Sequence, residues 1–343
     1  SQPLVTNMRM LNTNRQLHQI SSAAQYVGLQ KDTGLPEFDA NVFASHRPDA
    51  HWVVVEEGVL KARCSLWWHH APPIPSGKAG LIGHYAAADD DSAATLLECA
   101  CRQLAEQGCT FAIGPMDQNT WRNYRFVVDE GDRPRFFLEP VTEPQWRQQL
   151  RRDGFAEIAW YCSALVEDLT VRCPRLSRVR ERMDAIGIRI RTLDRNQLDS
   201  ELKQIFAIVQ LAFQDNPFYV PVSEADFLEM YRPLGHAIPT ELILLAEHDE
   251  KVIGFIFAVP DLLQAKRELP IDTVVVKTFG VLPGRAHAGV GQVLLEEVHQ
   301  RAANAGFRNA IHALVREAAH MNRIVDRYGI SFRRYALFGK ELG

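Results

Sequence analysis

Hydrophobic positions follow the same pattern twice along the chain. Residues 96–113 and residues 294–311 both begin with Leu-Leu-Glu, reach a glycine after nine intervening residues and end in Ala-Ile. In the second copy, one face at a 3.6-residue spacing holds Val290, Val293, Leu294 and Val298. Each copy therefore predicts an amphipathic helix that ends at a glycine, Gly108 or Gly306, followed at once by a short apolar strand.

Each copy also follows a predicted hairpin and a further strand. The hairpins and strands are Trp52–Val55 with Val59–Trp68 and then Ala79–Ala87 in the first half, and Leu242–Ala246 with Val252–Pro260 and then Thr273–Val281 in the second. A helix between two strands of one sheet makes a right-handed parallel crossover. Both halves thus predict an α/β fold with a mixed sheet, ordered hairpin, strand, helix, strand.

A charged, proline-bearing stretch marks the predicted boundary between the halves. Asp168–Pro174 separates a predicted strand, Ile158–Val166, from a predicted short helix, Leu176–Ile186. Ile188–Thr192 then opens the second sheet, and an amphipathic helix follows over Leu198–Phe213. The predicted domains are therefore residues 1–170 and 171–343. The first half carries an additional polar insertion over residues 114–144.

Composition narrows the class of protein. The 343 residues are 46% hydrophobic and 23% charged, as in ordinary globular proteins, and the net charge of −4 gives no basic footprint for nucleic acid. No apolar run reaches the ~20 residues that span a bilayer, and the first residues lack the apolar core of a signal peptide. The six cysteines are spread along the chain, which predicts reduced, mostly buried thiols and a cytoplasmic protein without a membrane partner. The oligomeric state stays open.

The segment Lys277–Gln292 carries the strongest chemical signal. It runs from a strand through a glycine-bearing loop into a helix, and such a loop brings backbone N–H groups and the helix N-terminus toward a phosphate. Gly289 and Gly291 leave no side chain in the way, or they only permit close helix–sheet packing. The full G-x-G-x-x-G of a dinucleotide fold and the Gly-Lys-Ser/Thr of a Walker loop are both missing.

This segment resembles the GNAT superfamily of acyl-CoA-dependent N-acyltransferases. The matching residues are Val281-Leu282-Pro283 at the strand end, Gly289-Val290-Gly291 in the loop and Val293-Leu294-Leu295 in the helix. Ile311–Val315 is similar to the next strand of that family and Phe332–Phe338 to its final strand. The resemblance covers residues 188–342, and residues 51–166 match it more loosely. It implies two GNAT-like domains in tandem.

The resemblance also implies which residues bind acyl-CoA and which act on it. The implied acyl-CoA-binding residues are Phe279, Gly280, Val281, Arg285, Ala286, His287, Ala288, Gly289, Val290, Gly291, Gln292 and Asn322. Ala286 stands where the family has a basic residue, and Arg285 lies one position away. The family's strand carboxylate is represented only by Asp272, at the start of the strand. The candidates for proton transfer are Tyr328, Tyr335 and His320.

The first half differs at the equivalent loop. Asp91-Ser92-Ala93 aligns with Gly289-Val290-Gly291 and follows two more aspartates, which favours a capped helix start but has the wrong charge for a diphosphate. We expect the first domain to form a wall of the substrate cleft or to serve a structural role. Its segment Gly114–Arg125 either grips the acceptor or is a folded surface loop. His69 and His70 point to opposite faces of a strand, so no metal site is predicted.

The sequence therefore predicts an acyl-CoA-dependent N-acyltransferase. We expect the acyl group to be acetyl, with acetyl-CoA or another acyl-CoA as co-substrate and an amine on a small molecule or peptide as acceptor. The alternative is a noncatalytic CoA- or ligand-binding or regulatory module on the same fold. Gly289→Glu is expected to abolish CoA binding and leave the fold intact, because the carboxylate would intrude on the phosphates.

Overall fold

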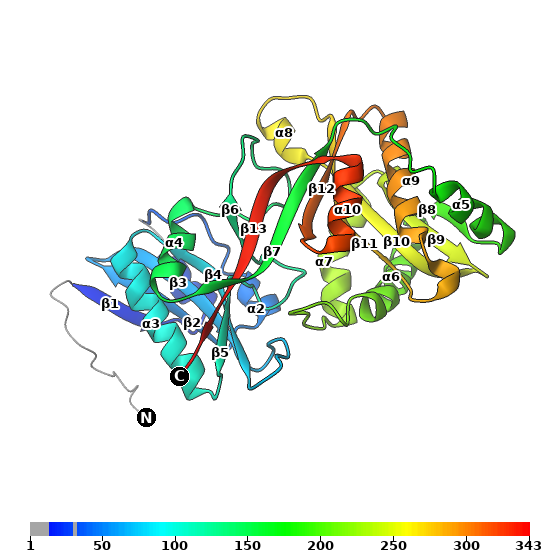
Figure 1. Ribbon diagram of the computed structural model, residues 1–343. Coiled ribbons are helices and arrows are strands. Elements are labelled where there is room, and N and C mark those ends of the chain that lie inside the picture. Colours follow the sequence, from blue (N-terminus) through cyan, green and yellow to red (C-terminus); the bar gives the residue numbers. More distant parts are fainter. Residues whose placement is uncertain (1–13, 30–32) are drawn as a thin grey trace. The chain divides into compact units, whose positions relative to one another are not determined.

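The computed structural model describes residues 14–29 and 33–343, apart from the side chains of residues 319–323, and divides into two compact units. Unit 1 holds the described chain up to Tyr124 with residues 145–156 and 338–343, and unit 2 holds residues 125–144 and 157–337 (Figure 1). The predicted domain boundary lies at residue 170, whereas unit 2 also includes residues 125–144 of the polar insertion and residues 157–166 of a long strand. Among the described residues, no helix is long and apolar enough to cross a bilayer.

Unit 1 is a mixed sheet with the long helix α3. Its elements are β1 (Arg15–Gln19), α1 (Ala23–Leu29), α2 (Val42–His46), β2 (Ala50–Glu56), β3 (Val59–Trp67), β4 (Ala79–Ala87), α3 (Asp90–Glu106), β5 (Phe111–Gly114) and α4 (Pro144–Arg152). The strands lie in the order β1-β2-β3-β4-β5, and residues 338–341 pair antiparallel with β5. Only β4 and β5 are parallel among these pairs, as the crossover through α3 predicts.

Unit 2 contains the larger sheet. Its elements are β6 (Phe126–Asp129), β7 (Ala156–Val166), α5 (Leu176–Ala185), β8 (Arg189–Thr192), α6 (Leu198–Ala212), α7 (Glu224–Ala237), β9 (Ile243–His248), β10 (Lys251–Pro260), α8 (Leu262–Lys266), β11 (Thr273–Val281), α9 (Val290–Asn304), β12 (Asn309–Arg316), α10 (Ala319–Tyr328) and β13 (Ile330–Glu341). The strand order is β13-β7-β12-β11-β10-β9-β8, with β6 beside β13. β11 and β12 form the parallel pair around α9.

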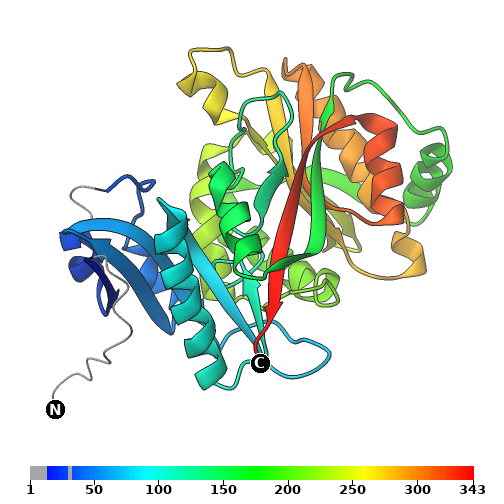
Figure 2. The same ribbon diagram turned by 60° about the vertical axis from the view of Figure 1, so that its left-hand side comes forward.

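Helices cover both faces of the unit 2 sheet (Figure 2). A Cβ on Gly280 of β11 would meet Phe213 at the end of α6, whereas a Cβ on Gly291 of α9 would meet Phe279 and Val281, the neighbours of Gly280. Successive strand residues point to opposite faces. Therefore α6, with α7 packed against it, lies on one face of β11, and α9 lies on the other.

The predicted α/β fold is confirmed, including strands that begin and end at the expected residues, Ala79–Ala87 and Thr273–Val281. Gly108 and Gly306 follow their helices with φ of +78° and +95°. All six cysteines are buried and free, as predicted. The sequence analysis missed α7, because Pro233 and Gly235 inside it are signals against a helix. Gly235 allows α7 to pack closely on α6, since a Cβ there would lie 2.6 Å from Leu198 Cδ1 unless that side chain moved.

Candidate functional site

The parallel strands β11 and β12 separate partway along their length. Their pairing runs from Thr273 opposite Asn309 to Val276 opposite His312, although β11 continues to Val281 and β12 to Arg316. We call the part beyond Val276 and His312 the strand divergence. On β12 the register with β7 also shifts after His312, and Leu314 has a φ of +57°. The divergence leaves one edge of residues 277–281 without a strand partner.

The loop after β11 leads directly into an uncapped helix N-terminus. A 3-10 turn over Arg285–His287 is followed by Gly289, which has a φ of +84° and precedes the first residue of α9, Val290. No side chain caps α9, because its N-cap residue is this glycine. The first N–H groups of any α-helix have no partner within the helix. The four amides of residues 289–292 are therefore available to an anion beside the strand divergence.

Gly289 is required by its backbone and by its neighbour. A Cβ there would lie 2.9 Å from Cγ2 of Val179 on α5, and the left-handed φ already disfavours any side chain. Gly289→Glu is therefore expected to lower the stability of the fold in addition to any loss of CoA binding. Gly289 permits close packing of α5 and also leaves the amides bare, so the two interpretations of this glycine do not exclude each other.

Alanine substitutions at Gly289 and Gly306 separate the cost of a left-handed backbone from the cost of a collision with Val179. We expect Gly289→Ala to lower the free energy of unfolding by roughly 2–4 kcal/mol, from the left-handed backbone and the collision with Val179 together. Gly306→Ala is the matched control, because Gly306 has a φ of +95° but nothing within 4 Å of its Cβ position. It should cost only about 1–2 kcal/mol, as measured by chemical denaturation. Equal costs for both variants would contradict the role of Val179.

Arg182 of α5 adds a positive charge to this loop, a contact that the sequence analysis did not predict. An Arg182 guanidinium N–H of α5 donates to the carbonyl oxygen of Ala288. Ala286 and Arg285 are exposed, and His287 Nδ1 lies 3.0 Å from the carbonyl oxygen of Leu282. Arg182 thus places a positive charge next to this loop, in which Ala286 occupies the position of the family's basic residue. Nothing in the local sequence signals this, because Arg182 is 106 residues from Ala288.

The two tyrosines predicted for proton transfer are buried and bonded to carboxylates. Tyr328 is 5% exposed and its hydroxyl donates to Glu296 of α9 at 2.8 Å. Tyr335 is fully buried; its hydroxyl donates to Glu139 and lies 3.0 Å from the Ser163 hydroxyl. Burial, reinforced by the carboxylate, raises the pKa of both phenols. Transfer of a proton from either tyrosine to a substrate would require this hydrogen bond to break.

Of the remaining predicted site residues, two have side chains outside the described residues, and the others lie between the end of β11 and the start of α9. The side chains of His320 and Asn322 lie outside the described residues, and α10 begins at Ala319 rather than at Asn322. The backbone of Phe279, Gly280 and Val281 lies in the strand divergence, next to the helix start that holds Val290, Gly291 and Gln292. The structure thus brings the predicted acyl-CoA-binding loop together and keeps Tyr328 and Tyr335 in buried networks.

Lys277 lies at the strand divergence, and the sequence analysis did not single it out. It lies in β11 one residue beyond the last pair with β12, and it is the extra residue of a β-bulge opposite β10. Burial and the nearby Arg125 charge lower the pKa of Lys277 to about 8. A lysine within an apolar strand pattern gives little warning of this, since the bulge depends on the partner strand.

In unit 1 the equivalent place is filled by the chain itself. β4 and β5 pair only as far as Leu81 and Ile113, and the N–H of Met116 then donates to the Ile82 carbonyl at 2.9 Å. Asp117 accepts from the His84 N–H at 2.6 Å, and burial raises the pKa of Asp117 to about 7. A Cβ on Gly83 would lie 2.3 Å from the Met116 carbonyl oxygen. Residues 115–119 are buried rather than a surface loop.

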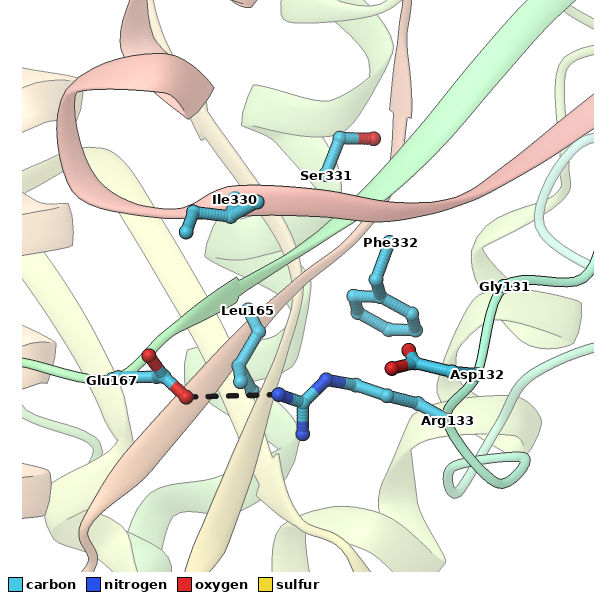
Figure 3. A pocket seen from close by; sticks show the side chains of 8 residues that line it. All are labelled: Gly131, Asp132, Arg133, Leu165, Glu167, Ile330, Ser331 and Phe332. Carbon is cyan, nitrogen blue, oxygen red and sulfur yellow. Dashed lines mark ion pairs between the residues drawn. The ribbon is translucent and has the colours of Figure 1, made fainter.

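A surface pocket of about 530 Å³ lies elsewhere in unit 2, lined by Gly131, Asp132, Arg133, Leu165, Glu167, Ile330, Ser331 and Phe332 (Figure 3). Arg133 and Glu167 form an ion pair across it at 3.6 Å. Leu165 pairs with Ile311 near the start of β12, so this pocket lies toward the opposite end of that strand from the divergence. Within the described residues, no cluster of His, Cys, Asp and Glu has the geometry of a metal site.

Comparison with known proteins agrees with this architecture. Residues 205–324 match the family model of the acetyltransferase (GNAT) family. The chain is similar to Protein YghO of Escherichia coli, with 23% identity over 322 residues that cover 85% of this chain and 82% of that protein. It is also similar to the bacterial ceramide synthase of Caulobacter vibrioides, with 25% identity over 234 residues, or 67% of this chain and 60% of the synthase.

Solved structures extend the likeness to both units. A tandem GNAT protein from the clavulanic acid biosynthesis pathway aligns with a TM-score of 0.52 and 12% identity, over 96% of this chain and 99% of that one. A glucosamine N-acetyltransferase region of a fungal GH3 β-N-acetylglucosaminidase aligns with a TM-score of 0.57 and 13% identity, over 97% of this chain and 39% of that one. At these identities the likeness supports a tandem arrangement of the fold.

Proposed function

Since this chain carries an acetyltransferase domain of the GNAT family, we propose that it transfers an acyl group, acetyl in the first instance, from an acyl-CoA to an amine of a small molecule or peptide. The amine attacks the thioester carbonyl, a C–N bond forms, the C–S bond breaks, and CoA leaves as the thiol. Residues 171–343 carry this chemistry in our proposal. Residues 1–170 shape the substrate site or stabilise the protein without binding CoA, in keeping with the filled divergence of unit 1.

The observation that carries this proposal is the bare N-terminus of α9 beside the strand divergence. The amides of residues 289–292 suit a diphosphate, and Arg182 and Arg285 add positive charge. The backbone of Phe279–Val281, unpaired toward β12, suits the pantetheine arm, and one of its N–H groups would polarise the thioester carbonyl. Holding the thioester and amine in this orientation is a large part of what such a reaction requires.

A second acceptor class follows from the relative called a bacterial ceramide synthase. A ceramide is a long-chain amino alcohol acylated on its nitrogen, so the name describes N-acylation of a lipid amine. Rings on the α6 and α7 side of the sheet are in mutual contact, among them Phe206, Phe227 and Tyr231. These rings are buried against one another, so it is the relative's name that favours a long-chain amine and a long-chain acyl-CoA as the alternative to acetyl transfer.

Titration calorimetry with acetyl-CoA, palmitoyl-CoA and free CoA tests the proposal. We expect binding in the micromolar range and release of free thiol when butylamine, glycinamide or a long-chain amino alcohol is added. The rival function, a noncatalytic or regulatory CoA-binding module, predicts binding without thiol release from any pair. Absence of binding at high micromolar concentration by the folded chain would falsify both.

A further inference from the structure

We infer that Lys277 is the general base of this reaction, a catalytic residue that accepts a proton from the acceptor's amino group; the inference rests on the proposed function. Lys277 lies where β11 leaves β12, two residues before the backbone proposed to hold the thioester. No carboxylate lies on β11, and Asp272 precedes its first residue. A base is therefore needed from another residue type.

A β-bulge directs the Lys277 side chain. Phe257 of β10 pairs with Thr278 and the next residue, Ala258, pairs with Val276, so Lys277 has no partner in this register. Strict alternation would place Lys277 with Phe279 on the α9 face of the sheet. Its Nζ instead lies 5.7 Å from the centroid of the Tyr231 ring on α7. The bulge thus turns the amine to the α6 and α7 face, as bulges near functional sites often do.

The groups around Lys277 disfavour its protonated form. Arg125, which precedes β6, donates to the Leu314 carbonyl of β12 at 3.0 Å, and its guanidinium lies 4.3 Å from the centroid of the Tyr161 ring. The positive charge of Arg125 repels a protonated Lys277. Tyr231 faces Lys277 from α7, and burial raises the pKa of that phenol, which keeps it neutral. Within the described part of the chain, Lys277 forms no ion pair. It is a half-buried amine with a cation nearby.

These surroundings suit a base more than a fixed cation. Burial and Arg125 bring the pKa of Lys277 to about 8, and a base works best when its pKa lies near the working pH. The acceptor's ammonium gives one proton to the neutral Nζ, and the freed lone pair attacks the thioester carbonyl. When the C–S bond breaks, the second proton passes from the new amide nitrogen to the departing sulfur. Lys277 then releases its proton to water, so one proton is produced for each acyl group transferred.

Two substitutions distinguish a base from an anion-binding cation. Lys277→Met removes both functions, whereas Lys277→Arg keeps the charge and cannot act as a base near neutral pH. At pH 8 we expect both variants to lower kcat/KM at least about 100-fold, measured by thiol release. The affinity for acetyl-CoA and the thermal unfolding temperature should stay close to wild type. Lys266→Met, on exposed α8, is the matched control and should keep full activity.

The pH profile provides the second measurement. The acidic limb of the wild-type kcat/KM profile should rise tenfold per pH unit and bend near pH 8, at the same pH for butylamine and for the less basic glycinamide, because it reports Lys277. The alkaline limb should follow the acceptor, whose ammonium form is the one that gives up the proton. An acidic-limb inflection that follows the basicity of the acceptor, or that persists in Lys277→Met, overturns the inference. So does a Lys277→Arg variant with near-wild-type activity, which would make this an anion site. If Lys277→Met does not fold, Lys277→Arg and the wild-type profile decide. A wild-type chain that binds no acyl-CoA overturns the proposed function itself.

Discussion

Glu139→Ala is expected to lower the free energy of unfolding of unit 2 by about 3–5 kcal/mol, because it leaves a buried arginine without its counter-ion. The Glu139 and Arg333 side chains are 1% and 7% exposed and 2.7 Å apart. Glu139 also accepts from the Tyr335 hydroxyl and from the Phe136 N–H, so Arg333, Tyr335 and Phe136 each lose one hydrogen-bond acceptor in this substitution. Urea unfolding followed by circular dichroism, with a separate transition fitted for each unit, measures the cost.

Glu143→Ala is the matched control, since Glu143 lies in the same segment and is partly exposed. It should change the free energy of unfolding by less than about 0.5 kcal/mol. Replacing the whole pair, as Glu139→Leu with Arg333→Met, should recover much of the stability, because apolar side chains of similar size need no counter-ion. A cost below about 1 kcal/mol for Glu139→Ala would show that water or another group already compensates Arg333.

Gln292→Glu is expected to weaken acetyl-CoA binding at least tenfold, a loss of about 1.4 kcal/mol. Gln292 is the third residue of α9, in the turn whose amides we propose to face the diphosphate. A carboxylate in the first turn of a helix stabilises that helix through the dipole, so the variant should fold at least as well as the wild type. The same carboxylate repels a diphosphate at close range, and titration calorimetry then reports binding alone.

Gln300→Glu makes the same change on the same helix, eight residues or roughly 12 Å further along. Its side chain is exposed and already accepts from Arg172, so a carboxylate is tolerated there. We expect its affinity for acetyl-CoA to stay within about twofold of the wild type, because salt screens charges at that distance. Equal losses in the two variants would mean that the diphosphate does not lie at the start of α9.

The site divides into a part that local sequence reveals and a part that it does not. The strand, glycine loop and helix start of Thr273–Gln292 are local features, and the helix start follows from the glycine at residue 289. The Arg182 contact with Ala288 and the Arg333 pair with Glu139 join residues 106 and 194 positions apart. The periodicity of a single segment does not predict such pairs. For the same reason the sequence did not show that Tyr328 and Tyr335, the tyrosines predicted for proton transfer, are buried and bonded to glutamates of other segments.

By itself the sequence determined most of the sheet strands, the helices α3, α5, α6 and α9, and that the halves repeat, because hydrophobic spacing and glycine conformation act over a few residues. The helix α7, against whose pattern Pro233 and Gly235 argue, was not determined in this way. The tertiary structure decided where a strand pair opens, which way Lys277 points and which charges are buried. Those features depend on the register between β10 and β11 and on which helices pack against β11. They arise from contacts between distant segments, whose free energies exist only after the chain has folded.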